Sequence, residues 1–323
     1  MKNMYKILSI LIVSISYFSI SKAQEIPSSF ADLAEKLMPS VVNISTTTTV
    51  TTRSNPLPFE FPPGSPFEDM FGSPQQRQTS ALGSGFIIDE EGIVITNNHV
   101  IQGASDIFVR VNGDEDYKAE VLGADAGMDI AVLKIKSDEK FKPVKFGNSD
   151  KSRIGDWVIA IGNPFGLGGT VTAGIISARN RSIGLSRYED YIQTDASINQ
   201  GNSGGPLFNM NGDVIGINTA ILGQSGSIGI GFAIPSNSAQ KVIEQLIEFG
   251  ETKRGWLGVR IQVVDQGIAD AEKLDKPRGA LVASVADNSP SDKGGIKPGD
   301  IILEFDGKPI NAVSYTHLRA HET

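Results

Sequence analysis

The sequence predicts an all-β protein, with a barrel or sandwich of short strands followed by a second, smaller domain. Between residues 83 and 234, short apolar runs alternate with turns rich in Gly, Asn and Asp, which is typical of antiparallel β-structure. A charged stretch at residues 251–254 is expected to be a hinge before the second domain. The expected strands include residues 86–88, 93–96, 107–111, 131–135, 157–161, 175–178 and 214–219.

Two helices are expected to flank these strands. The first is capped by Ser28 or Ser29 and stops at Pro39. Ser236 is expected to cap the second, which Gly250 ends. Apolar residues recur at helical spacing in both, namely Phe30, Leu33, Ala34 and Leu37 in the first and Val242, Ile243, Leu246 and Ile247 in the second.

Residues 1–23 are predicted to be a cleavable signal peptide. Two lysines precede an apolar run at residues 7–20, and the small residues Ser21 and Ala23 mark a cleavage site after Ala23. The alternative is a single membrane anchor, but the run is shorter than the roughly 20 residues that span a bilayer. We therefore expect the chain to be exported.

Composition excludes several classes of function. The chain has 323 residues, of which 40% are hydrophobic and 20% charged, as in ordinary globular proteins. Its formal net charge of -8 disfavours a general nucleic-acid platform, which needs a basic surface. The absence of cysteine from the sequence excludes disulfides, thiolate metal sites and a cysteine nucleophile. No phosphate-binding G-x-x-x-x-G-K-[ST] motif occurs, so no nucleotide is implied. We also expect no metal and no other cofactor.

A strand at residues 41–44 is expected to lead into a long mobile loop at residues 46–80. This segment is rich in Thr, Pro, Gly, Gln and Phe, and its prolines oppose regular structure. It is either a passive linker or a segment that docks elsewhere, since its several phenylalanines are costly to leave in water.

A serine on a glycine-rich loop, Ser203, is the candidate nucleophile. Glycines allow a tight turn whose backbone N–H groups can point at an oxyanion. A serine alcohol also needs a neighbouring base and an acid that orients it. Of the three histidines, His317 and His321 lie in the tail at residues 313–323, which leaves His99. Asp129 begins an alternating strand. The residues follow the order His, Asp, Ser.

These segments resemble the catalytic motifs of the HtrA/DegP (Do-like) bacterial serine endoproteases. The matching stretches are Thr96-Asn97-x-His99-Val100, Asp129-Ile130-Ala131-Val132 and Gly201-Asn202-Ser203-Gly204-Gly205-Pro206-Leu207. The resemblance implies a chymotrypsin-like double β-barrel protease domain at residues 24–250, with His99 and Asp129 in the first barrel and Ser203 in the second. It also implies that residues 46–80 are a regulatory loop.

The resemblance assigns roles to these residues. Ser203 attacks the peptide carbonyl, His99 carries the proton and Asp129 holds the imidazole tautomer. The N–H groups of Gly201 and Ser203 form the oxyanion hole, with Asn202 as a further candidate. One departure is Gln200, where many relatives have proline.

The specificity pocket is expected to accept medium aliphatic side chains. Ser197 occupies the position at which trypsin-like enzymes carry an aspartate, which argues against a basic-residue pocket. By resemblance, the pocket is walled by Ile198 and by a loop that offers Ile228 and Ile230. The alternative is that the two loop isoleucines are core residues.

Residues 255–312 resemble a partial PDZ domain. Trp256, Leu257, Gly258 and Val259 match the loop whose amides receive a terminal carboxylate, and the following strand would pair with the bound peptide. The alternative is an unrelated small β-domain. Residues 313–323 lack apolar periodicity and resemble a sequencing adapter, so we expect an artefact there and give His317 and His321 no metal role.

The resemblance implies an ATP-independent periplasmic endoprotease that degrades misfolded envelope proteins and has chaperone activity. Expected partners are unfolded or misfolded polypeptides, C-terminal peptides bound by the PDZ domain, and other copies of the chain in a homotrimer or multiples of trimers. Two other functions stay open: a chaperone or peptide-binding scaffold in which proteolysis is secondary, and a processing protease with one cut site.

Overall fold

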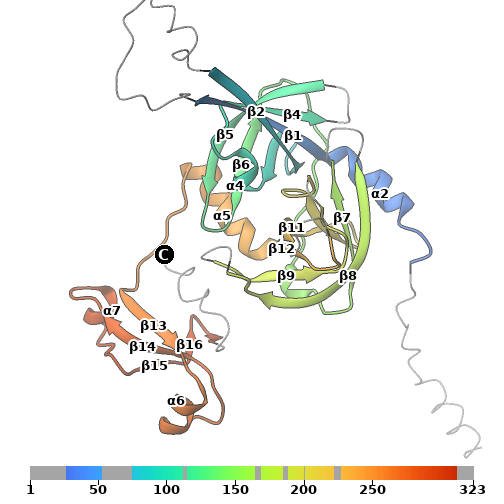
Figure 1. Cartoon of the computed structure of the whole chain (residues 1–323). Helices are drawn as coiled ribbons and strands as arrows, with labels where there is room; N and C mark the ends of the chain where they lie inside the picture. The colour runs from blue at the N-terminus through green and yellow to red at the C-terminus, as the bar shows by residue number, and fades with distance from the viewer. Residues whose placement is uncertain are drawn as a thin grey trace, which may run out of the picture. The chain divides into compact units, whose positions relative to one another are not determined.

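The computed structural model describes residues 27–52, 75–111, 115–163, 169–184, 188–199, 201–221 and 227–310 (Figure 1). The predicted signal peptide, the predicted tail artefact and Gln200 lie outside these residues. Helix α2 (Ala31–Leu37) begins as expected after Ser29, whose Oγ accepts a hydrogen bond from the Ala31 amide at 3.0 Å. The 3-10 helix η1 (Met38–Ser40) follows. No helix within the described ranges is long and apolar enough to span a membrane.

The first domain contains two closed antiparallel barrels, which confirms the all-β prediction. The first barrel has the strand order β1-β2-β3-β6-β5-β4. Alternate residues of these strands point inward, and the enclosed core is mainly aliphatic, including Ile44, Ile87, Val109 and Leu133. The strands are β1 (Val41–Thr52), β2 (Gln75–Ile87), β3 (Ile93–Thr96), β4 (Asp106–Val111), β5 (Glu115–Asp125) and β6 (Ile130–Ile135).

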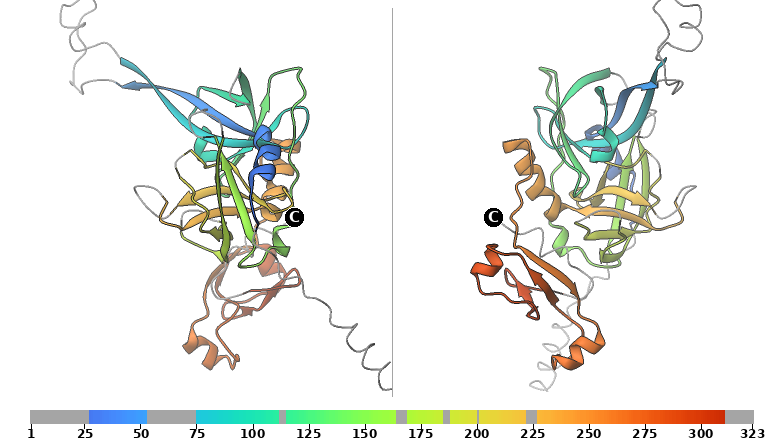
Figure 2. Two further views of the ribbon diagram at one scale, coloured as in Figure 1. Left: turned by 90° about the vertical axis from the view of Figure 1, so that its right-hand side faces the viewer. Right: turned by 60° about the vertical axis from the view of Figure 1, so that its left-hand side comes forward.

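The expected loop at residues 46–80 is shorter than predicted. Strands β1 and β2 remain paired in one continuous register from Val41↔Phe86 to Thr52↔Gln75. They project from the barrel as a hairpin (Figure 2). The reason is the run of β-branched residues at 46–52, which favours extended backbone. The prolines that argued for irregular structure lie in residues 53–74, outside the described residues.

The second barrel has the strand order β10-β11-β12-β9-β8-β7. Its core also consists of small and aliphatic side chains, among them Val158, Ile176, Leu207 and Ile215. Sequence analysis located β7, β8 and β11, and the expected spans for β8 and β11 were too short. The strands are β7 (Trp157–Gly162), β8 (Thr170–Arg181), β9 (Tyr191–Thr194), β10 (Pro206–Asn209), β11 (Val214–Ile221) and β12 (Gly231–Pro235).

Helix α5 (Ser236–Phe249) packs against strands of both barrels. It ends at Gly250 as predicted, because Gly250 adopts the left-handed conformation with φ 75°. Two predictions about this helix were wrong. Ser236 does not cap it, since its Oγ donates to the Gly147 carbonyl at 2.7 Å. Ile247 is 40% exposed rather than on the buried face.

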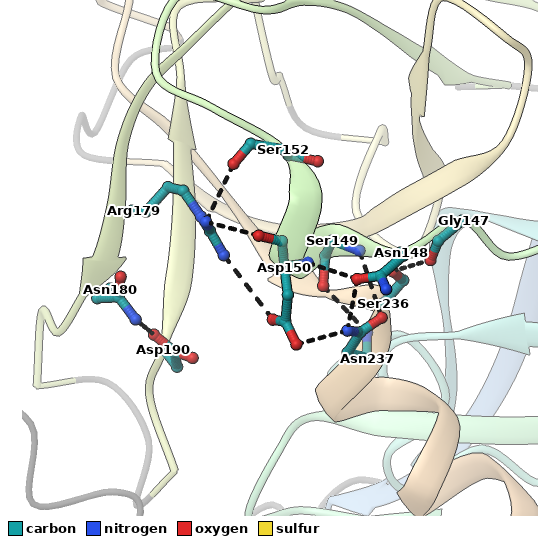
Figure 3. A network of polar contacts seen from close by, with 10 residues as sticks. All are labelled: Gly147, Asn148, Ser149, Asp150, Ser152, Arg179, Asn180, Asp190, Ser236 and Asn237. Atoms are coloured by element: carbon teal, nitrogen blue, oxygen red, sulfur yellow. Dashed lines mark hydrogen bonds and ion pairs between the residues drawn. The ribbon is translucent and has the colours of Figure 1, made fainter. Parts of the chain in front are cut away.

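The start of α5 is held by a polar network from the segment that contains the 3-10 helix η2 (Ser149–Lys151) (Figure 3). The Ser149 hydroxyl accepts the Asn237 amide at 3.2 Å. The Asn237 side chain donates to Asn148 Oδ1 at 2.9 Å and to Asp150 Oδ2 at 2.7 Å. Arg179 of β8 donates to the Ser152 carbonyl of the same segment at 3.0 Å. The cap of α5 therefore comes from a distant part of the chain.

The charged stretch at residues 251–254 does not form the free hinge that was expected. Lys253 Nζ lies 3.6 Å from the centre of the Phe249 ring. Arg254 donates two hydrogen bonds to Asp125, at 2.5 and 2.9 Å. The Asp125 carboxylate is buried and requires a charged partner there, so the arginine is held in place.

The second domain contains a three-stranded sheet with the order β13-β14-β15 and a two-stranded sheet, β16-β17. Ala280 and Ile310 form the buried centre, with Leu257, Ile261 and Phe305 packed against it. The elements are β13 (Val259–Val263), α6 (Gln266–Ala271), β14 (Ala280–Val285), α7 (Pro290–Lys293), β15 (Ile301–Ile302), β16 (Glu304–Phe305) and β17 (Lys308–Pro309).

Candidate active site

His99 and Asp129 lie together at one end of the first barrel. His99 belongs to the short helix α4 (Asn98–Ile101), which directly follows β3, and Asp129 directly precedes β6. Because β3 and β6 are antiparallel neighbours, these two ends meet. The His99 Nδ1 atom is 2.6 Å from Asp129 Oδ2, and the His99 amide donates to Asp129 Oδ1 at 2.9 Å. The carboxylate thus fixes both the ring and the backbone of the histidine.

The backbone of Asp129 adopts the left-handed conformation, with φ 57°. An aspartate tolerates this region better than most residues. Two donors hold its carbonyl: the Asn97 side chain at 2.8 Å and the Asn98 amide at 3.2 Å. Asp125 closes the turn that precedes Asp129, because its Oδ1 accepts a hydrogen bond from the Met128 amide at 2.7 Å. The strained residue is therefore held from both sides.

The Asp129 carboxylate has a further partner that the sequence did not indicate. Thr219 on β11 of the second barrel donates its hydroxyl hydrogen to Asp129 Oδ2 at 2.7 Å. Its neighbour Asn218 accepts a hydrogen bond from the Gly204 amide at 2.8 Å and donates to the Gly205 carbonyl at 2.9 Å. Two consecutive residues of β11 therefore connect the carboxylate to the loop that carries Ser203, residues 201–205, which we call the serine loop. The spacing from Asp129 to Thr219 offers no signal for this contact in the sequence.

Ser203 lies on the loop that leads into β10 of the second barrel, close to the end of β3. The segment fits so closely that a Cβ atom on Gly204 would lie 2.2 Å from the Ser84 carbonyl and 2.3 Å from Thr96 Oγ1. Among the hydrogen bonds of the described residues, none joins Ser203 Oγ to His99. The structure thus brings the serine loop to the end of β3, just before His99, without a hydrogen bond between Ser203 Oγ and His99.

Hydrogen bonds in the serine loop leave particular amides free. The Asn202 amide donates to the Asn199 carbonyl at 3.0 Å, and the Gly204 amide donates to Asn218 at 2.8 Å. Within the described part of the chain, the amides of Gly201 and Ser203 have no hydrogen-bond partner. These are the two amides that the sequence assigned to an oxyanion hole, whereas the Asn202 amide is already engaged.

The three isoleucines assigned to the specificity pocket differ in their surroundings. Ile198 is fully buried in the second-barrel core, so its side chain offers no surface to a substrate in this structure. Ile228 is 66% exposed, which excludes the alternative that it is a core residue. Ile230 is half-buried and directly precedes β12. Most of the loop between β11 and Ile228 lies outside the described residues.

The expected carboxylate loop directly precedes β13. Leu257 packs toward the core of the second domain, whereas Trp256 is 64% exposed. Gly258 has φ 81°, and a Cβ there would lie 2.1 Å from Ser289 Cβ, so glycine is required. Within the described residues, the amides of Leu257 and Gly258 donate no hydrogen bond, while Val259 begins the strand.

One buried ion pair lies next to the turn that carries Asp129. Arg254 pairs with Asp125, and their side chains are 22% and 5% exposed. The Arg254 guanidinium also lies 4.3 Å from the centre of the Tyr188 ring. Burial alone would raise the pKa of Asp125, but the hydrogen bonds from Arg254 and from the Met128 amide outweigh it and lower that pKa. The Asp125 carboxylate therefore stays ionised although it is buried.

Within the described ranges, no group of three or more His, Cys, Asp and Glu side chains is arranged to hold a metal ion. The expectation that the chain needs no metal remains a prediction.

The double barrel, the His99–Asp129 pair and the serine loop with two free amides define a trypsin-like serine peptidase. The trypsin-like peptidase domain family matches residues 83–217, and the PDZ domain family matches residues 255–320. A "Probable periplasmic serine endoprotease DegP-like" of Marinomonas sp. (strain MWYL1) is 49% identical over 296 residues, covering 87% of this chain and 63% of the relative. The "Periplasmic serine endoprotease DegP" of Escherichia coli (strain K12) is 45% identical over 325 residues, which cover 94% of this chain and 68% of the relative.

Solved structures agree with these relatives. The structure "HtrA-type protease AlgW with decapeptide" has a TM-score of 0.70 at 42% identity, covering 90% of this chain and 89% of that one. The structure "HtrA-type protease AlgW with tripeptide" has a TM-score of 0.73 at 40% identity. The chain belongs to the HtrA/DegP family of serine endoproteases. It spans 63% of the length of the Marinomonas relative.

Proposed function

We propose that this chain is an ATP-independent serine endopeptidase that cleaves unfolded or misfolded polypeptides in the periplasm. The observation that carries the proposal is the 2.6 Å contact between His99 Nδ1 and Asp129 Oδ2, beside a serine loop that leaves the Gly201 and Ser203 amides free. The names of the relatives support the compartment.

The chemistry follows from this arrangement. Asp129 holds Nδ1–H of His99, so that Nε2 is left to accept a proton. Ser203 Oγ attacks the peptide carbonyl as His99 takes its proton, and the same proton then goes to the leaving amine. Water hydrolyses the acyl-enzyme by the reverse path. The two free amides stabilise the oxyanion; loss of one such donor typically slows kcat by about 10²–10³-fold.

The contact between Ser203 and His99 is expected to form in the substrate complex, where catalytic hydrogen bonds often tighten. Ile228 and Ile230 are proposed to contact an aliphatic side chain of the substrate. The free amides of Leu257 and Gly258 are proposed to receive the carboxylate of a C-terminal peptide, which adds a strand beside β13. Assembly into trimers and a chaperone activity are further parts of the proposal.

A comparison of wild type, Ser203→Ala and His99→Ala tests the proposal. Denatured casein serves as substrate, and a fluorophosphonate labels the nucleophile. We expect both variants to lose cleavage and labelling, and the double variant to be little worse than either, because triad members act as a unit. Aggregation of unfolded casein is measured in parallel. Absence of cleavage by wild type, with aggregation suppressed, would instead favour the scaffold function.

A further inference from the structure

Ser84 in β2 of the first barrel is fully buried and contacts several separate segments at the junction of the two barrels. Its hydroxyl donates to the Gly201 carbonyl at 2.5 Å and accepts the Asn163 amide at 2.8 Å. Its own amide donates to the Ser203 carbonyl at 2.9 Å, and its carbonyl accepts the Thr96 hydroxyl at 2.8 Å. All its polar groups are therefore used, two of them on the serine loop.

These contacts determine which way the peptide groups of the serine loop face. The peptide between Gly201 and Asn202 is held at its oxygen by Ser84 and at its N–H by Asn199. The peptide between Ser203 and Gly204 is held at its oxygen by the Ser84 amide and at its N–H by Asn218. With these two peptide planes fixed, the Ser203 N–H between them and the Gly201 N–H just before them are left without a partner among the described residues.

The left-handed glycines of the loop make such clamping necessary. Gly201 has φ 97° and Gly204 has φ 85°. Glycine moves between backbone conformations at little cost, so the loop could rotate its peptides out of this arrangement. Contacts from outside the loop oppose that rotation, together with the internal bond from the Gly205 amide to the Asn202 carbonyl at 3.0 Å. The Ser84 hydroxyl is the outside contact to the peptide nearest the Gly201 amide.

Resting on the proposed function, we infer that Ser84 is a positioning residue for the oxyanion hole. It acts through the loop backbone and does not touch the substrate. Through its carbonyl it also holds Thr96, which ends the strand before His99. One buried serine thus contacts both the loop that carries the oxyanion donors and the strand end that precedes His99.

The test is Ser84→Ala, which removes the hydroxyl and keeps both backbone contacts. We expect kcat to fall about 10- to 100-fold, less than the 10²–10³-fold for outright loss of an oxyanion donor, with KM within about twofold. Ser149→Ala is the matched control, because Ser149 is also fully buried and accepts a backbone amide, but at the start of α5. It should lower the melting temperature comparably and leave kcat unchanged.

A second readout separates positioning from general destabilisation. A peptide ending in an aliphatic boronic acid forms a tetrahedral adduct with Ser203 that occupies the oxyanion hole. Its affinity should fall in Ser84→Ala by the same factor as kcat/KM. Binding of the uncleaved substrate peptide, compared in the Ser203→Ala background with and without Ser84→Ala, should not change.

The inference is overturned if folded Ser84→Ala keeps kcat within twofold of wild type, or if boronate affinity is unchanged. It is also overturned if Ser149→Ala loses kcat equally. Should Ser84→Ala not fold, the same measurements are made on Ser84→Cys, whose thiol is a weaker donor. A loss of more than twofold in both kcat and boronate affinity is then expected, and unchanged values overturn the inference. An inactive wild type would refute the proposed function itself, and an active wild type with no effect at Ser84 would refute this inference alone.

Discussion

Arg254→Ala should destabilise the catalytic domain more than any loss of a surface ion pair. The substitution removes both hydrogen bonds from Arg254 to Asp125, whose side chain is 5% exposed. Breaking a buried pair from one side typically costs 3–5 kcal/mol, because the other charge stays buried. Arg254 is 22% exposed and Asp125 keeps the Met128 amide, which places the expected loss near the lower end, at about 3 kcal/mol.

Removing the charge of Asp125, the other partner of the ion pair, should cost less stability. In Asp125→Asn the arginine can turn toward solvent, and the asparagine oxygen can still accept the Met128 amide, so we expect about 1–2 kcal/mol. The control is Arg153→Ala, since Arg153 pairs with Asp156 at the surface and is 74% exposed. That change should cost under about 1 kcal/mol.

The assay is urea unfolding of full-length protein, followed by tryptophan fluorescence at several pH values. Because the folded pKa of Asp125 is lowered, its stabilising contribution is complete above its unfolded pKa and is lost as the pH falls through the folded value. Wild type should therefore lose stability on acidification below about pH 4, and Asp125→Asn should lose less. Equal costs for Arg254→Ala and Arg153→Ala, or the same acid dependence in Asp125→Asn, would refute the reasoning.

Two further predictions concern contacts between distant segments. Thr219→Val removes the hydroxyl donor to Asp129 and should lower kcat about tenfold or more with KM unchanged, in steady-state kinetics with a peptide substrate; an unchanged kcat would exclude a positioning role. Asn237→Ala removes the side-chain bonds to Asp150 and Asn148 at the start of α5 and should lower stability by about 1–2 kcal/mol in urea unfolding, without changing kcat. A loss of catalysis greater than the loss of folded protein would contradict the second prediction.

The sequence by itself determined the class of fold and the candidate residues. Short apolar runs with period-two alternation predict strands whatever their partners, and turns of Gly, Asn and Asp locate their ends. A glycine-flanked serine together with one histidine outside the tail left few choices for the nucleophile and base. In the structure His99 Nδ1 lies 2.6 Å from Asp129 Oδ2, and the catalytic roles of these residues stay predictions.

Predictions from sequence patterns were wrong at positions where a local signal was overridden by a neighbouring signal or by a tertiary contact. Residues 46–52 adjoin a proline-rich segment, and their β-branched side chains favour a strand that continues to Thr52. Ser236 has the right residue type for a cap, but its hydroxyl is bound by Gly147 of another segment. Ile198 has the right position for a pocket wall, but it is buried in the barrel core.

Only the tertiary structure revealed the residues that hold the site. Thr219 reaches Asp129 from the other barrel, Ser84 reaches the Gly201 carbonyl, and Arg254 neutralises Asp125. Each contact joins segments that are far apart in the chain. Strand periodicity specifies which side of a strand faces inward, but the antiparallel closure of each barrel decides which strand ends meet. Candidate catalytic residues can thus be predicted from the sequence, whereas the hydrogen bonds that would support them depend on how the barrels close.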